Sequence, residues 1–226
     1  LRCDRELVKQ MLIYGVPTGL QMSIISVSDM TLQAMVNTYG TALIVAYGVC
    51  IKVEGVGWQM AEAIGTSLGT FTGQNVGANH LDRVKQGVRY TQMMVLGWSV
   101  FVMFLMFFFG KYLTYLFVDP SEQDVVNVSV TYFRTVFWAY PFLGSIFLYR
   151  NTLQGMGYGL VPMLGGVFEL VARTGIVVLI AGHTSFAGVC MADPTAWIAA
   201  LIPLIPYYFH VMKKYKNKSQ VQVIED

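Results

Sequence analysis

Residues 88–109 read VRYTQMMVLGWSVFVMFLMFFF, a stretch that contains no charged side chain after Arg89. A helix of about 20 apolar residues is long enough to cross the ~30 Å hydrocarbon core of a bilayer. The pattern therefore predicts an all-α membrane protein, a bundle of six transmembrane helices. The other five predicted spans lie at residues 11–36, 41–72, 126–149, 160–181 and 194–212.

The composition excludes several other classes of protein. Only 12% of the 226 residues are charged, against about 25% in soluble proteins. The basic residues flank the spans and form no stripe interleaved with stacking aromatics, so no nucleic-acid partner is expected. The three cysteines and three histidines have no spacing typical of a metal site. Neither a Gly-x-Ser-x-Gly nor a His-Glu-x-x-His motif occurs, so neither an enzyme nor a cofactor is expected.

The Lys and Arg residues are distributed unequally about the predicted spans. If the spans cross alternately, one side of the membrane receives eleven of the fifteen basic residues, whereas the other receives only Lys111. Basic loops face the cytoplasm, so both termini and the polar tail 213–226 are predicted to be cytoplasmic. The eleven are Arg2, Arg5, Lys9, Arg83, Lys85, Arg89, Arg150, Lys213, Lys214, Lys216 and Lys218.

Prolines and small residues inside the spans predict local features of the helices. Pro17 and Pro141 each remove a backbone hydrogen bond, which predicts a kink at each position. Ala61, Gly65, Gly69 and Gly73 recur every four residues. Such rows of small residues let helix backbones approach closely in a membrane, so we interpret them as a packing surface. Residues 73–87 are predicted to form the main cytoplasmic loop.

Ionisable residues inside a membrane either pair with one another or line a path for ions or substrates. If the first outer turn centres near Gly40, Asp29 lies at the depth of Lys52, and the two are expected to form a structural ion pair. Glu54 lies slightly deeper and has no evident basic partner, which makes it the first candidate for coupling transport to a cation. Asp29 remains a second candidate for that role.

A second intramembrane pair is predicted from spacing alone. Glu169 and Arg173 lie four residues apart and therefore on one helix face, where their charges can neutralise each other. They are interpreted as structural.

Three motifs occur in order along the chain: a span-opening Gly15-Val16-Pro17, then Gly73-Gln74-Asn75-Val76-Gly77-Ala78, then Arg150-Asn151-Thr152-Leu153-Gln154-Gly155. Taken together, they resemble the C-terminal half of a multidrug and toxic compound extrusion (MATE) transporter. The resemblance implies one six-helix lobe, residues 1–212, of a twelve-helix transporter in the plasma (inner) membrane. It also implies a missing N-terminal six-helix lobe as partner and export of drug-like organic cations or other xenobiotics in exchange for H⁺ or Na⁺.

The resemblance also has departures and alternatives. The Na⁺-coupled branch carries a glutamate eight residues after the proline, whereas this chain has Ile25 there and Asp29 one turn later. In the family the motif residues serve as loop and helix-packing residues. A lipid-linked oligosaccharide flippase of the same superfamily would need several unpaired intramembrane arginines, and the spans offer only Arg134 and Arg173. A truncated fragment without transport activity is a third possibility.

The charge distribution makes a topology prediction. In a background without Cys3, Cys50 and Cys190, a membrane-impermeant thiol reagent added to intact cells should label Ser121→Cys and not Ser219→Cys. Labelling of Ser219→Cys from outside would contradict the cytoplasmic assignment of the termini.

Overall fold

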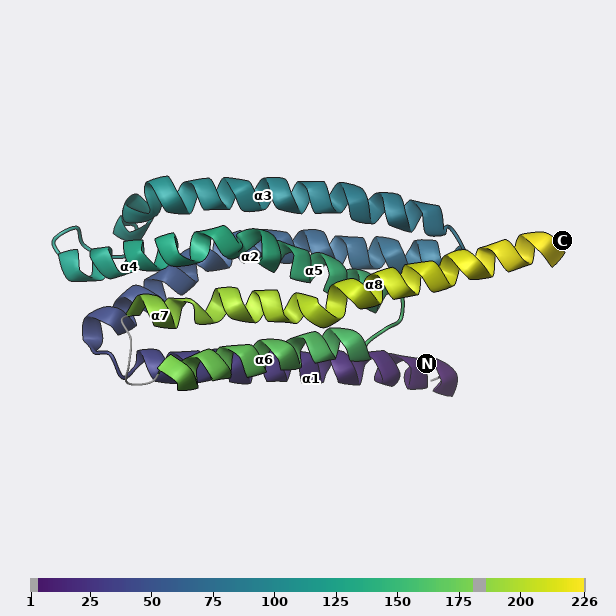
Figure 1. Cartoon of the computed structure of the whole chain (residues 1–226), viewed down its shortest axis with the longest axis horizontal. Helices are drawn as coiled ribbons and strands as arrows, with labels where there is room; N and C mark the ends of the chain where they lie inside the picture. The colour runs from purple at the N-terminus through teal and green to yellow at the C-terminus, as the bar shows by residue number, and fades with distance from the viewer. Residues whose placement is uncertain (1–3, 181–185, 226) are drawn as a thin grey trace.

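The computed structural model describes residues 4–180 and 186–225, and every regular element in these ranges is helical. The long helices run up and down one axis, and both chain ends lie at the same end of the bundle (Figure 1). Arg2, residue 181 at the expected end of the fifth span, and residue 226 lie outside the described residues. The elements are α1 (Arg5–Val36), α2 (Thr41–Gly77), α3 (Leu81–Tyr115), α4 (Gln123–Val136), the 3₁₀ helix η1 (Phe137–Ala139), α5 (Tyr140–Gly155), α6 (Leu160–Ile180), α7 (Phe186–Cys190) and α8 (Ala192–Glu225).

Five segments are long and apolar enough to cross a membrane as single stretches, and each overlaps one of the six predicted spans. The remaining predicted span, residues 126–149, is divided between α4, η1 and α5. The break falls just before Pro141, which sits in the first turn of α5, where its missing N–H costs no helical bond. Pro17, in contrast, lies inside α1 without ending it. The five segments are Val8–Val36, Thr41–Gly77, Leu81–Tyr115, Leu160–Leu179 and Phe186–Tyr215.

The predicted loop at residues 73–87 is wrong, because α2 and α3 both extend into it. Only Ala78–His80 lies outside the two helices. Polar residues beyond the hydrocarbon can remain helical, which keeps their backbone N–H and C=O groups hydrogen-bonded. The helix α2 therefore continues to Gly77 and ends shortly before Asn79, which adopts a left-handed conformation at φ 59°. The His80 N–H then donates to the Asn75 carbonyl at 2.8 Å. Of the motif residues, Gly73, Gln74, Asn75 and Gly77 belong to the end of α2, and Ala78 follows it.

The row of small residues on α2 packs against α5, as predicted. A Cβ atom on Gly65 would lie 2.9 Å from the Phe147 carbonyl oxygen, and one on Gly69 would lie 3.0 Å from that of Asn151. A Cβ atom on Gly155 would overlap the carbonyl oxygen of Gly69. The two backbones are therefore in direct contact, with no room for a side chain between them.

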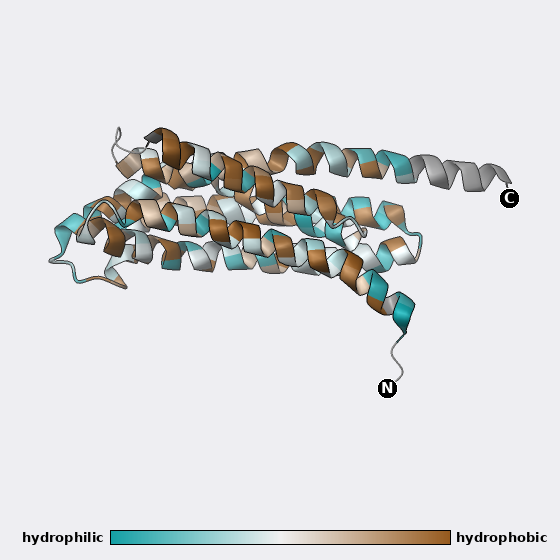
Figure 2. Ribbon diagram, turned by 90° about the horizontal axis from the view of Figure 1, so that it is seen from below, coloured by the Kyte–Doolittle hydropathy of each residue, from teal (hydrophilic) through white to brown (hydrophobic). Residues whose placement is uncertain are grey.

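The helices form two packing groups rather than a chain of hairpins. In the first group α1 and α8 pack against α6, and in the second α2 packs against α3, α4 and α5. Contacts between α5 and α8 join the groups, and Figure 1 shows α1 and α3 at opposite edges of the bundle. Many large apolar side chains are exposed along the helices, and hydrophilic residues are more frequent near the turns (Figure 2). Since α1 and α2 barely touch, a space remains between them.

The backbone contact between α2 and α5 predicts a large effect of added volume. Gly155→Val should lower the apparent melting temperature of the detergent-solubilised protein, because overpacking costs about 1–3 kcal/mol. Gly97→Val in α3 is the matched control, because a Cβ atom there meets no atom within 4 Å. Equal melting temperatures for the two variants would contradict the close approach.

Candidate functional site: an acidic cleft

A cleft of about 540 Å³ opens between α1 and α2, with walls from α5, α6 and α8. We call it the acidic cleft, because five carboxylates and only two guanidinium groups line it. These side chains come from five helices that are far apart in sequence. They are Asp29, Glu54, Glu62, Glu169 and Asp193, with Arg150 and Arg173.

Arg173 of α6 is the centre of the polar network in the cleft, and its side chain is only 3% exposed. Its Nη1 donates to Asp29 Oδ1 and to Ser28 Oγ, both at 2.7 Å. Its Nε and Nη2 lie 3.1 and 3.0 Å from Asp193 Oδ1. Its Nη2 also lies 3.5 Å from Glu169 Oε1. One guanidinium therefore connects α1, α6 and α8 through charge-assisted bonds.

The predicted pair between Asp29 and Lys52 is wrong, because Asp29 pairs with Arg173 instead. The depth estimate assumed that α1 and α2 lie side by side as a hairpin, whereas α1 packs against α6. Lys52 is exposed, and its Nζ lies 6.0 Å from the centre of the Phe117 ring at the end of α3. This is the distance range of a cation–π contact. The predicted contact between Glu169 and Arg173 is present at 3.5 Å.

Arg150 was expected in a cytoplasmic turn, but it is buried inside the bundle. The helix α5 continues to Gly155, which carries Arg150 more than one turn below the end of the helix. Its Nη2 lies 3.4 Å from Glu169 Oε2, and its Nε has no partner among the described residues. Arg150 therefore does not belong to the basic residues of the cytoplasmic turns. Glu169 contacts both Arg150 and Arg173.

Glu54 of α2 is buried and, as predicted, has no ion-pair partner among the described residues. Its Oε2 accepts a hydrogen bond from the Tyr132 hydroxyl at 2.9 Å. The same hydroxyl lies 3.3 Å from Asp193 Oδ2. A phenol has a single proton, so it can satisfy only one of the two carboxylates at a time. Glu54 Oε1 has no partner within the described part of the chain.

Sequence reasoning missed Tyr132 and Asp193, both of which complete this arrangement. Asp193 lies next to the predicted start of the last span, so it was grouped with the preceding loop. A signal was available, since Asp193 directly precedes Pro194 and thus fits the first turn of a helix. Tyr132 is one of thirteen tyrosines, and no pattern distinguishes it from the others.

Aromatic rings form the apolar part of the cleft wall. Trp58 stacks on Phe147 with ring centres 6.1 Å apart and an interplanar angle of 16°. Trp197 and Tyr47 also line the cleft. The site thus combines carboxylates with flat ring surfaces, the two features that recognise organic cations.

Residues 17–179 match the MatE family model. The chain belongs to the MatE family. It is 27% identical to the probable multidrug resistance protein YoeA of Bacillus subtilis over an alignment of 227 positions, which covers 98% of this chain and 48% of that protein. It is 30% identical to the probable multidrug resistance protein YpnP of the same organism over 143 residues, which are 63% of this chain and 32% of that protein.

Solved structures agree with the MatE fold. A MATE protein in complex with MaL6 superposes with a TM-score of 0.87 at 17% identity, covering 96% of this chain and 49% of that chain. A MOP-superfamily transporter from Pyrococcus furiosus gives 0.86 at 18% identity, covering 95% and 49%. The chain thus spans about half the length of these structures and of YoeA. It has the fold of one MATE lobe and is a multi-pass membrane protein.

The third of the MatE-like motifs also contacts the first helix. The Gln154 side-chain amide donates to Gln21 Oε1 at 3.1 Å, across 133 positions of sequence. Gln21 is fully buried. This motif therefore fixes α5 to α1, while its neighbour Gly155 fixes α5 to α2.

The network around Arg173 makes a stability prediction. Arg173→Met leaves Asp193 and Glu169 buried without their common partner, so the protein should lose roughly 3–5 kcal/mol of stability. Asp29→Asn should cost less, since the Asp29 side chain is 62% exposed. Lys52→Met is the control, and its melting temperature in detergent should stay close to that of the parent protein. A loss of stability for Lys52→Met as large as that for Arg173→Met would instead support the predicted Asp29–Lys52 ion pair.

Proposed function

We propose that this chain is one wall of a secondary-active antiporter that exports drug-like organic cations in exchange for H⁺ or Na⁺. Its relatives YoeA and YpnP are described as probable multidrug resistance proteins. The chain spans about half of YoeA, so a second six-helix lobe would supply the opposite wall. Transport sites of repeat-built transporters lie between the two halves. The open acidic cleft would then form this lobe's part of the transport site.

One observation carries the coupling role, namely the single Tyr132 hydroxyl between Glu54 and Asp193. Arg173 already balances Asp193 at its other oxygen, whereas no described Lys or Arg forms an ion pair with Glu54. An unbalanced carboxylate inside a membrane is costly, and either a proton or a metal cation removes that cost. Glu54 is therefore our coupling residue, and Tyr132 and Asp193 position it. Asp29, which Arg173 neutralises, fits a structural role better.

The chemistry of the cleft supports a cationic substrate. Carboxylates outnumber guanidinium groups along its wall, and Trp58 and Phe147 present stacked ring faces beside them. A drug cation and the coupling cation would then compete for one negatively charged space. Such competition gives exchange, because each one leaves when the other binds.

The same groups argue against a flippase for pyrophosphate-linked sugars. Arg150 and Arg173 are the guanidinium groups lining the cleft, and carboxylates engage both of them. The arginines would have to leave these carboxylates in order to bind a pyrophosphate. Arg134 is exposed on α4 and does not line the cleft.

The charge distribution also supports an orientation. Even without Arg150, the basic residues of the turns and termini concentrate at the end of the bundle that holds both termini. The positive-inside rule then makes this end cytoplasmic. The acidic cleft of a transporter in the plasma (inner) membrane would thus exchange its cations between cytoplasm and exterior.

The coupling role predicts a selective transport defect. In proteoliposomes containing the two-lobe protein, Glu54→Gln should reduce gradient-driven efflux of an ethidium-like cation by about tenfold or more, which corresponds to roughly 1.4 kcal/mol. Binding of the same cation should persist. Tyr132→Phe should give an intermediate defect, because it removes the 2.9 Å hydrogen bond that Glu54 accepts from the Tyr132 hydroxyl.

The control is Glu122→Gln, which removes an exposed carboxylate outside the cleft. Proton and sodium gradients imposed separately would identify the coupling ion. Normal efflux by Glu54→Gln at every pH near neutrality, under both gradients, would rule out Glu54 as the coupling acid. Complete absence of efflux by the parent protein under both gradients would instead favour a fragment without transport activity.

A further inference from the structure

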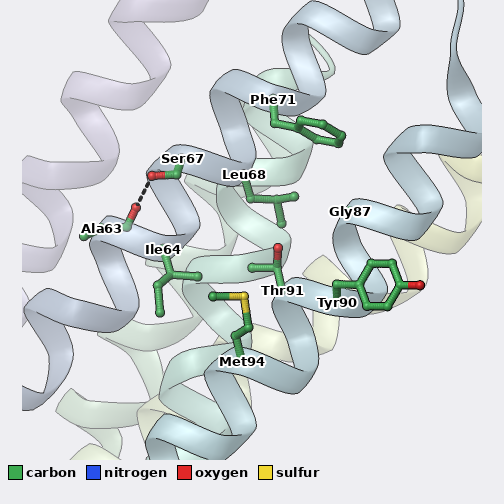
Figure 3. Close-up of a pocket in the computed structure, with 9 residues that line it drawn as sticks. All are labelled: Ala63, Ile64, Ser67, Leu68, Phe71, Gly87, Tyr90, Thr91 and Met94. Atoms are coloured by element: carbon green, nitrogen blue, oxygen red, sulfur yellow. Dashed lines mark hydrogen bonds between the residues drawn. The ribbon is translucent and has the colours of Figure 1, made fainter.

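A second concavity lies on the outside of the bundle, between α2 and α3 (Figure 3). Its volume is about 470 Å³. The helix α3 contributes no residue to the acidic cleft, so this groove belongs to a different face of the molecule. We call it the α2–α3 groove, and it is lined by Ala63, Ile64, Ser67, Leu68, Phe71, Gly87, Tyr90, Thr91 and Met94.

The α2–α3 groove has an almost entirely apolar lining. The Ser67 hydroxyl donates to the Ala63 carbonyl of its own helix at 2.9 Å, the bond drawn in Figure 3. Its proton is therefore not available to an occupant. A Cβ atom on Gly87 would lie 2.6 Å from the Phe71 ring. The absence of a side chain at Gly87 therefore leaves space for that ring. An occupant of this groove has to be apolar over most of its length.

The groove lies in one half of the bilayer. Its α2 residues, 63–71, precede the end of α2 at Gly77. At 1.5 Å per residue they lie roughly 2–14 Å from residue 72, the predicted end of the second span. Half of a ~30 Å hydrocarbon core is about 15 Å. The groove thus extends along the acyl chains of the leaflet at the end of the bundle that carries both termini.

The basic side chain of Arg83 lies in line with the groove, on the side towards the lipid headgroups. Arg83 precedes Gly87, Tyr90 and Met94 by four, seven and eleven residues, so it lies on the same face of α3. It is exposed and has no carboxylate partner among the described residues. Lys85 lies on the other side of α3 and is neutralised by Asp82 at 3.4 Å. Of these two basic residues of α3, Arg83 is therefore the one that is unneutralised and in line with the groove.

We propose that the α2–α3 groove holds one acyl chain of an anionic phospholipid from this leaflet, with the phosphate headgroup at Arg83. The apolar lining fits the chain, and the single aligned cation fits the negative headgroup. Anionic headgroups attract basic residues at the membrane surface by about fivefold in affinity for each Lys or Arg. The site depends neither on the transport function nor on the identity of the coupling ion.

The test is a lipid titration of the purified full-length protein, followed by native mass spectrometry. Two probes with the same acyl chains are compared, dioleoyl phosphatidylglycerol and dioleoyl phosphatidylcholine. The parent protein should retain the anionic lipid about fivefold more tightly. Ser67→Phe, which fills the groove from an exposed position, should abolish this retained lipid. Arg83→Gln should lower the affinity for phosphatidylglycerol to that for phosphatidylcholine.

Each variant has a matched control. Thr66→Phe adds the same ring to the neighbouring exposed position of α2, outside the groove, and should bind as the parent does. Lys85→Gln removes a cation from the other side of α3 and should also leave binding unchanged. Parent-like binding by Ser67→Phe would overturn the site, and equal affinity of the parent for both lipids would overturn the headgroup assignment. If Ser67→Phe instead disrupted association with a second lobe while lipid retention persisted, the occupant would be protein and the proposal wrong.

Discussion

A single buried guanidinium, that of Arg173, holds together the first packing group of this lobe, α1, α6 and α8. Removing such a charge from water costs several kcal/mol, and only close partners offset that cost. Those partners come from α1, α6 and α8, so these helices are held at one depth. Asp193, once fixed by Arg173, reaches the Tyr132 hydroxyl, which also reaches Glu54. The positions of Asp29, Glu169 and Asp193 in the cleft therefore follow from one ion-pair network, to which Tyr132 connects Glu54.

The sequence predicts well those features that depend on one helix or on one short segment. The apolar stretches locate the spans, the small residues of α2 locate its contact with α5, and the dipeptide Tyr140-Pro141 locates the break in the fourth span. Each of these signals is local. The MATE-like motifs could likewise be recognised because they occur in a fixed order along the chain.

The sequence fails where the answer depends on which helix is the neighbour. Hydropathy gives the depth of a residue along its helix, but not which neighbouring helix its side chain faces. The prediction therefore paired Asp29 with Lys52 across a hairpin of α1 and α2, whereas these two helices do not pack side by side. Hydropathy also marks the end of the hydrocarbon, not the end of the helix, which is why Arg150 was placed in a turn. Tyr132 acts through contacts with α2 and α8 alone, and no spacing in the chain encodes them.

The divided fourth span has a consequence for how the chain enters a membrane. The helix α4 is only 14 residues long and carries Asp124, Asn127 and Arg134, while α5 has 16 residues. Neither half is long enough to be recognised as a spanning helix by itself. Its entry must therefore be assisted by helices made earlier, with α2 and α3 offering the surface on which both halves pack. During synthesis, the order in which helices leave the ribosome thus becomes part of the information that builds the bundle.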